Sequence, residues 1–150
     1  MNNTDIPDIN SVKHHYAGVF LVTESGEVIG QLRDDKPSID NPGRVATFGG
    51  QVEDEDQSPL HGALRELTEE VSLVFDPLEI FTLSEYVAWR PKTKEWQVLH
   101  FFYLNIADDD LSSMEVFEGQ GWTVITGPND SRLAEGWKSA AATLFDKLGL

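Results

Sequence analysis

Three glutamates and an arginine fall within six residues, RELTEE, from Arg65 to Glu70. If this segment is helical, Glu66, Glu69 and Glu70 stand at positions i, i+3 and i+4 and share one surface of the helix. Like charges at this spacing repel one another by roughly 0.2–0.5 kcal/mol per pair when they are solvated. A divalent cation would turn that repulsion into attraction, and oxygen ligands at this density suit Mg²⁺ or Mn²⁺. Read by itself, the pattern indicates either a cation site or a solvated acidic helix face.

The residues before and after RELTEE predict the helix that carries it. Ser58 is expected as the N-cap and Pro59 as the first helical residue. The expected buried stripe consists of Leu60, Leu64, Leu67 and Val71. Upstream, a short strand, VATF, runs into the pair Gly49–Gly50, which allows a tight turn and the close approach of a backbone carbonyl to a ligand. An acidic loop, QVEDEDQ, then leads to the helix.

The rest of the chain predicts a sheet with a helix on each side. Strands are expected at 16–23, 28–33, 78–89, 95–106 and 122–126. The third and fourth of these read as a hairpin, while 34–43 and 107–121 read as loops. Spaced apolar residues from Leu133 to Leu148 predict a C-terminal helix. We therefore expect an α/β (α+β) fold, with a mixed or antiparallel sheet packed between helices.

Composition restricts the class of protein. A chain of 150 residues with 40% hydrophobic residues fits one soluble domain, here 13–150 after a flexible arm at 1–12. It has no cysteine for disulfides or thiolate metal sites, and no apolar run of membrane-spanning length. A cytoplasmic location without a membrane partner is the expectation. The formal net charge of −15 argues against nucleic-acid binding, because such affinity depends on Lys and Arg neutralising phosphates.

The stretch GGQVEDEDQSPLHGALRELTEEVSL resembles the conserved box of the Nudix hydrolases. That box reads G, five residues, E, seven residues, then R-E-U-x-E-E-x-G-U, where U is a bulky aliphatic residue. The matching positions are Arg65, Glu66, Leu67, Glu69, Glu70 and Leu73. The preceding segment QLRDDKPSIDNPGRVATFGG also resembles the lead-in of this family. The resemblance implies the family's α/β/α sandwich for residues 13–150.

The chain departs from the family pattern at three points. Gln57 stands where the box has its first glutamate, and Ser72 stands where it has its last glycine. The loop from Gly50 to Arg65 is one residue longer than the family spacing. Either Gln57 accepts a hydrogen bond from Arg65, or Asp56 slips into the place of the missing glutamate.

The resemblance implies a Mg²⁺-dependent enzyme, with Mn²⁺ as the other candidate ion. It would hydrolyse a nucleoside diphosphate linked to another group, such as a nucleoside triphosphate, an ADP-ribose-like compound or a nucleotide sugar. Glu66, Glu69, Glu70 and the Gly50 carbonyl would bind metal, and Glu66 would bind metal or act on the attacking water. Arg65 would hold the loop. A further acid is expected from the loop beyond the box, with Glu118 as the first candidate and Glu115 as the second.

Substrate contacts are predicted at two places. Arg33 and Asp35 follow the second strand, where they can reach phosphate or sugar. Trp89 and Arg90 begin the basic hairpin tip, WRPKTKEW, and are suited to stacking on a base and pairing with phosphate, although a solvated hairpin tip is the more common explanation. Two other functions stay open: a binding module on the same fold without catalysis, and an RNA-processing enzyme. A homodimer is also compatible with the sequence.

Overall fold

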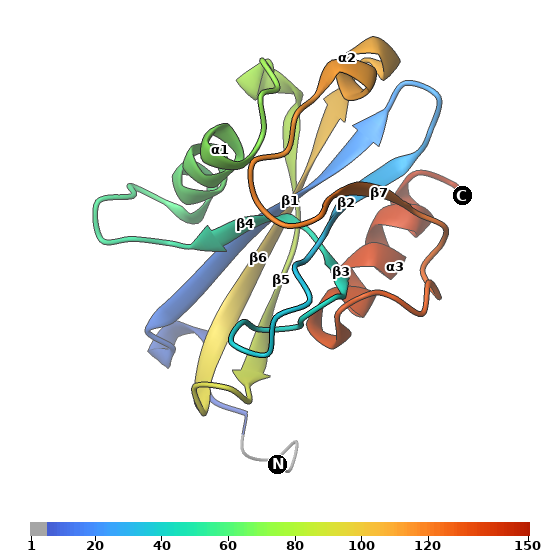
Figure 1. Cartoon of the computed structure of the whole chain (residues 1–150). Helices are drawn as coiled ribbons and strands as arrows, with labels where there is room; N and C mark the ends of the chain where they lie inside the picture. The colour runs from blue at the N-terminus through green and yellow to red at the C-terminus, as the bar shows by residue number, and fades with distance from the viewer. Residues whose placement is uncertain (1–5) are drawn as a thin grey trace.

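The first long strand, β1 (His14–Thr23), lies at the centre of a seven-stranded mixed sheet (Figure 1). The computed structural model describes residues 6–150. Along one edge, β1 pairs in parallel with β6 (Glu95–Ile106). Along the other edge, β4 (Phe48–Gln51) and β2 (Val28–Leu32) each pair with it antiparallel. The strand is central because nearly all of its side chains are apolar and buried.

The outer strands complete the sheet. β5 (Ile80–Arg90) pairs antiparallel with β6 and forms the predicted hairpin, with a bulge between Thr82 and Ser84. β3 (Val45–Ala46) and β7 (Gly121–Ile125) both pair antiparallel with β2. The predicted mixed sheet is therefore confirmed.

Helices cover both faces of this sheet (Figure 1). α1 (Pro59–Glu70) and the short α2 (Asp108–Ser113) lie on one face, and α3 (Lys138–Lys147) lies on the other. Alternation along β1 divides the core, because Val19 and Leu21 pack toward α1 while Phe20 and Val22 pack toward α3. The result is the predicted α/β/α sandwich.

Within residues 6–150, three short 3-10 helices flank these elements: Ile9–Ser11, Pro77–Glu79 and Glu135–Trp137. The arm expected at 1–12 falls partly outside the described residues, which begin at Ile6. Val12, at its end, is buried. Within residues 6–150, no helix has the length and apolar character needed to span a membrane.

Several predicted boundaries were wrong. The expected loop at 107–121 contains the short helix α2. Three aspartates in its first turn favour a helix N-terminus, and Leu111 is its one buried side chain. The C-terminal helix begins at Lys138, because Leu133 instead forms a bridge to Val45. The glycine pair lies inside β4 rather than after the strand. On α1, Leu60 is exposed, and the buried face consists of Gly62, Ala63, Leu67 and Glu70.

Candidate functional site

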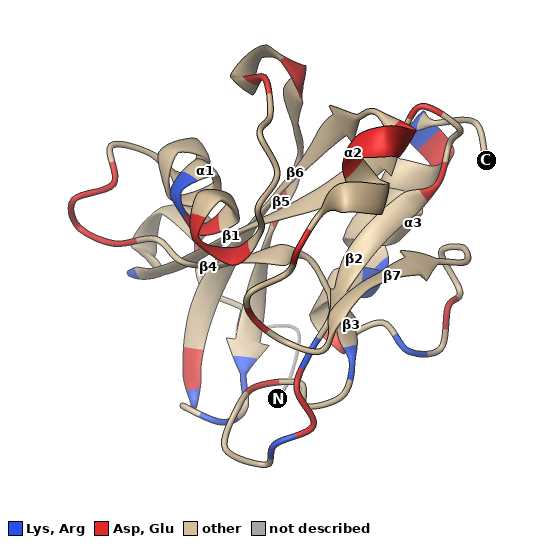
Figure 2. Ribbon diagram, turned by 45° about the horizontal axis from the view of Figure 1, so that its top comes forward, with Lys and Arg blue, Asp and Glu red and all other residues tan. Residues whose placement is uncertain are grey.

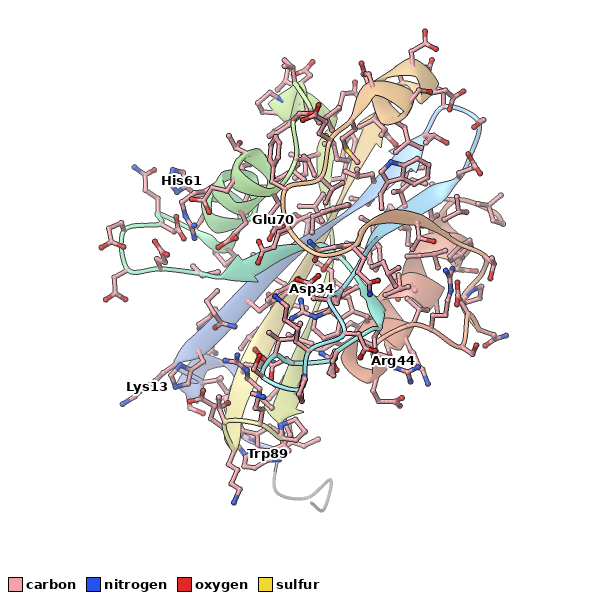
Figure 3. All side chains as sticks on the ribbon, in the orientation of Figure 1. Lys13, Asp34, Arg44, His61, Glu70 and Trp89 are labelled. Atoms are coloured by element: carbon pink, nitrogen blue, oxygen red, sulfur yellow. The ribbon has the colours of Figure 1, made fainter. Side chains whose placement is uncertain are left out.

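The buried face of α1 ends in a carboxylate. Ser58 caps the helix as predicted, with Oγ accepting from the His61 N–H at 3.1 Å. Eleven residues after Pro59, Glu70 shares the buried face with Leu67 and is only 3% exposed. Figure 3 shows Glu70 between α1, β4 and the loop that precedes β7. An acidic side chain at such a position costs free energy unless partners compensate for the lost water.

The glycine pair allows α1 to approach β4 closely. The Gly49 N–H donates to Glu70 Oε2 at 2.9 Å. A side chain on Gly50 would place Cβ 2.5 Å from the carboxyl carbon of Glu66, so the Glu66 carboxylate would have to leave this position. The pair therefore serves to seat two glutamates of the helix against the strand.

Glu118 joins these glutamates from the loop before β7. The pKa of Glu70 is raised to about 9, first by burial and then by the nearby carboxylates of Glu118 and Glu66. The pKa of Glu66 is also raised, first by burial and to a smaller extent by Glu69 and Glu118, while Arg65 opposes the shift. Glu118 thus lies beside the helix glutamates, as the first candidate for the extra acid was expected to. Glu115, the second candidate, contributes to neither shift.

The residue that holds Arg65 is Asp56. The guanidinium donates from Nε and Nη2 to the two carboxylate oxygens of Asp56, at 3.0 and 2.9 Å. These hydrogen bonds hold the pKa of Asp56 well below its ordinary value. Arg65 Nη2 also donates to the Gln51 carbonyl at 3.2 Å, and Nη1 donates to Glu66 at 3.1 Å. Of the two alternatives left by the sequence, the longer loop places Asp56 rather than Gln57 against the arginine.

Ser72 ties the end of α1 to the loop that carries Glu118. Its Oγ accepts from the Glu115 N–H at 2.8 Å, and its own N–H donates to the Glu115 carbonyl at 2.9 Å. Two residues after Glu115, the Phe117 N–H donates to the Glu70 carbonyl at 2.7 Å. Among the non-glycine residues of 6–150, positive φ occurs at Asn41 and Lys94 and not at Ser72, so this position does not require glycine.

The chemistry of the glutamate cluster fits a hard divalent cation. Glu66, Glu70 and Glu118 bring carboxylate oxygens together, and burial with repulsion from neighbouring carboxylates disfavours the charged forms of Glu66 and Glu70. A cation with oxygen ligands removes both penalties. Glu69 is more exposed and lies 3.4 Å from Arg65 Nη1. Across residues 6–150, no three carboxylate or imidazole groups are already gathered closely enough to enclose an ion.

A cavity of about 690 Å³ opens beside the cluster. Gly49, Gly50 and Glu118 contribute to its wall, as do the aromatic rings of Trp89 and Trp137. Figure 2 shows mostly acidic residues around α1 and its neighbouring loops, whereas Lys and Arg stand among acidic residues near the hairpin tip and in the loop between β2 and β3. The cavity therefore connects a carboxylate cluster with an aromatic and basic region.

Three of the four residues predicted to contact substrate line this cavity: Arg33, Trp89 and Arg90. Both arginines are engaged by the loop at 34–43, because Arg33 Nε donates to the Asp40 carbonyl at 2.8 Å and Arg90 Nε donates to Asp40 Oδ2 at 2.8 Å. Asp35 is not part of the wall and lies against Gly43. Arg90 and Lys92 of the tip thus contact the loop at 34–43, which forms part of the cavity wall, while residues 91–94 of the tip are exposed.

The sequence reasoning missed the aromatic floor of the cavity. Tyr16 and Trp137 meet edge to face, with ring centroids 5.3 Å apart. Thr47 Oγ1 joins them, at 2.8 Å from the Tyr16 hydroxyl and 2.8 Å from Trp137 Nε1. The three residues come from β1, the segment between β3 and β4, and the 3-10 helix before α3. No local pattern marks such a set, because its members meet only in the folded chain.

The chain is similar to known proteins in both sequence family and fold. The family model described as NUDIX domain matches residues 12–127. None of the curated proteins is significantly similar to the chain in sequence. Among solved structures, a C. elegans Ap4A hydrolase binary complex is 14% identical with a TM-score of 0.69, covering 91% of this chain and 98% of that one.

Two further structures share the fold. The NUDIX domain of Shewanella oneidensis NrtR complexed with ADP ribose is 16% identical with a TM-score of 0.68, covering 99% of both chains. A bifunctional NMN adenylyltransferase/ADP ribose pyrophosphatase from Francisella tularensis, complexed with AMP and a Mn ion, is 16% identical with a TM-score of 0.62. That match covers 90% of this chain and 41% of the other. At these identities the similarity establishes the fold.

Proposed function

The chain belongs to the Nudix hydrolase family, and from that premise we propose that it hydrolyses the diphosphate bond of a nucleoside diphosphate linked to another group. Nucleoside triphosphates, ADP-ribose-like compounds and nucleotide sugars all contain this bond. The structural relatives bound to ADP ribose or to AMP support a nucleotide as the substrate class.

One observation carries this proposal: a carboxylate cluster built around the buried Glu70 opens onto a cavity large enough for a nucleotide. Glu70 lies against the Gly49 N–H, and Glu66 and Glu118 lie beside it. Glu118, Gly49 and Gly50 also form part of the cavity wall. A phosphate chain entering the cavity would therefore meet the carboxylates at their accessible side.

The carboxylates and the phosphates are both negative, so the site requires a cation between them. Mg²⁺ fits best, with Mn²⁺ as an alternative, because both prefer oxygen ligands and share their coordination with phosphate and water. We assign metal binding to Glu66, Glu69, Glu70 and the Gly50 carbonyl. When bound, the ion supplies charge neutralisation of the diphosphate and lowers the pKa of water near it.

The protein's own groups orient the reaction. Hydrolysis joins a water oxygen to one phosphorus, and the bridging oxygen leaves with the other phosphate. Glu66 is assigned to orient that water and to accept its proton on a carboxylate oxygen. Arg65, fixed by Asp56 and the Gln51 carbonyl, holds the loop and Glu66 in position. Glu118, in the loop before β7, supplies the further acid.

A substrate screen tests the proposal. Wild-type protein, Glu70→Gln and the control Glu79→Gln are incubated with Mg²⁺ and a panel of nucleotide derivatives, and the products are identified. Glu79 is an exposed carboxylate in the 3-10 helix before β5, away from the cluster. We expect the wild type and Glu79→Gln to release a nucleoside monophosphate, and Glu70→Gln to lose most of this activity. Equal turnover by all three proteins would overturn the assigned roles.

The same screen separates an enzyme from a binding module on this fold. The module was suggested by Gln57, Ser72 and the longer loop. Asp56 satisfies Arg65 in place of Gln57, and Ser72 forms two hydrogen bonds with Glu115. These contacts favour the enzyme. Nucleotide binding measured by calorimetry without turnover of any substrate would favour the module instead.

A further inference from the structure

One buried amide stands apart from the other buried polar side chains. Within residues 6–150, six polar or charged residues are buried: Thr23, Gln31, Thr47, Glu70, Gln97 and Asp130. The side chains of the other five form hydrogen bonds within the protein. Gln97 is 8% exposed, and its amide forms no hydrogen bond with any described residue. Among residues 6–150, the fully enclosed side-chain polar atom without a hydrogen-bond partner is Ser84 Oγ, so the unpaired Gln97 amide is not sealed inside the protein but is reached from the cavity, where a ligand can pair with it.

The fold directs Gln97 toward the substrate cavity. It lies on β6, opposite Ala88 on β5 and His14 on β1. Leu99 follows two residues later on the same strand and therefore faces the same side of the sheet. Gln97, Leu99 and Ala88 all line the cavity, together with Tyr16 and Trp137. The amide thus belongs to a mostly apolar and aromatic floor.

Four polar groups of the cavity wall are already bonded to protein partners. The Tyr16 hydroxyl and Trp137 Nε1 both bond to Thr47. Arg90 bonds to Asp40, and Lys92 Nζ donates to the Pro37 carbonyl at 2.8 Å. Gln97 differs from these four groups because it retains both a donor and an acceptor for a ligand. The amides of Asn41 and Gln51 in the same wall are also unpaired, but those residues are less buried than Gln97.

We propose that Gln97 is a substrate-binding residue that hydrogen-bonds the edge of the substrate's nucleobase. Its amide presents a donor beside an acceptor, which matches a base edge where an acceptor adjoins a donor. Adenine and cytosine offer an amine next to a ring nitrogen, and guanine and uracil offer a carbonyl next to a ring N–H. The aromatic rings beside the amide provide flat surfaces for the base. This inference rests on the proposed function, since it takes the ligand to be a nucleotide.

Binding measurements test the inference without turnover. Calorimetry with AMP, CMP, GMP, UMP and the base-free probe ribose 5-phosphate is carried out on wild type, Gln97→Leu and Gln97→Glu. Asn105→Leu is the matched control, because Asn105 is an exposed amide on the same strand outside this cavity. Thermal melts confirm that each variant is folded.

Two results are expected. Gln97→Leu weakens binding of the preferred mononucleotide by roughly tenfold, while ribose 5-phosphate binds as it does to wild type. Gln97→Glu presents two acceptors, so the ratio of GMP to AMP affinity rises by roughly tenfold, because guanine alone offers two adjacent donors on one edge. Asn105→Leu changes neither value.

The opposite results are equally clear. Unchanged mononucleotide affinities in both Gln97 variants would overturn the inference, as would an equal loss for nucleotides and ribose 5-phosphate. So would a wild type that binds none of the four mononucleotides. The proposed function is judged separately, because it fails only if the substrate screen shows no turnover that depends on Glu70.

Discussion

Arg65 and Asp56 form a bidentate ion pair, with Nε and Nη2 of the arginine 3.0 and 2.9 Å from the two carboxylate oxygens. The Asp56 side chain is only 2% exposed, and its Oδ2 also accepts from the Glu53 N–H at 2.8 Å. The Asp56 carboxylate therefore accepts hydrogen bonds both from within the acidic loop and from Arg65 on α1, so it ties the loop to the helix. Paired, charge-assisted hydrogen bonds of this geometry fix orientation as well as adding stability.

Replacing Asp56 with asparagine is expected to impair catalysis more than replacing Gln57 with alanine. Asp56→Asn removes the charge that holds Arg65, and Arg65 in turn positions Glu66. We expect kcat/KM to fall on the order of 10–100-fold and Tm to fall, because small displacements of catalytic groups are costly. Gln57→Ala serves as the control and should resemble wild type. A larger loss for Gln57→Ala would return the supporting role to Gln57.

Glu70→Gln is expected to stabilise the cation-free protein while removing its activity. The pKa of Glu70 is about 9 in the folded protein, compared with its ordinary value of 4.5. As pH rises, the Glu70 carboxyl therefore loses its proton in the unfolded state before it does so in the folded state. Wild-type stability should therefore fall between pH 4.5 and 9, whereas the neutral glutamine lacks this contribution. Thermal melts in EDTA should show a Tm advantage of Glu70→Gln that grows across this range. Parallel Tm profiles would contradict the raised pKa.

Ser72→Ala tests whether the end of α1 positions the loop that carries Glu118. The change removes the hydrogen bond from the Glu115 N–H but keeps the reverse backbone bond. We expect kcat/KM to fall by about fivefold, the value of one hydrogen bond of about 1 kcal/mol, with a small change in Tm. Ser139→Ala, at an exposed position on α3, is the control. Full activity in Ser72→Ala would show that the backbone bonds alone hold the loop.

A double-mutant cycle on Arg90 and Asp40 separates two roles for the arginine. If Arg90 fastens the loop at 34–43, Arg90→Ala and Asp40→Asn should each raise KM, and the double variant should be no worse than either. Cleavage of that loop by a protease should accelerate equally in all three. Additive increases in KM would instead indicate that Arg90 contacts the substrate independently of Asp40.

The sequence alone determined the features that depend on local spacing. Helical periodicity is enough to place Glu66, Glu69 and Glu70 on one surface, and Ser58 with Pro59 is enough to start the helix. Strand alternation and turn residues likewise predicted the hairpin and the sheet. The weaker local signals failed, as at α2, where six residues with one buried side chain give too little periodicity to detect.

Tertiary structure decided the features that join distant segments. Arg65 selects Asp56 over its neighbour Gln57 because the path of the loop, not the residue spacing, sets which side chain reaches the guanidinium. Glu70 is buried because β4 and the loop before β7 close over it, and Arg90 meets Asp40 across 50 residues of chain. Gln97 lacks a protein partner only because the elements around it assemble into a cavity. Contacts of this kind depend on how the elements pack, and local spacing does not encode that packing.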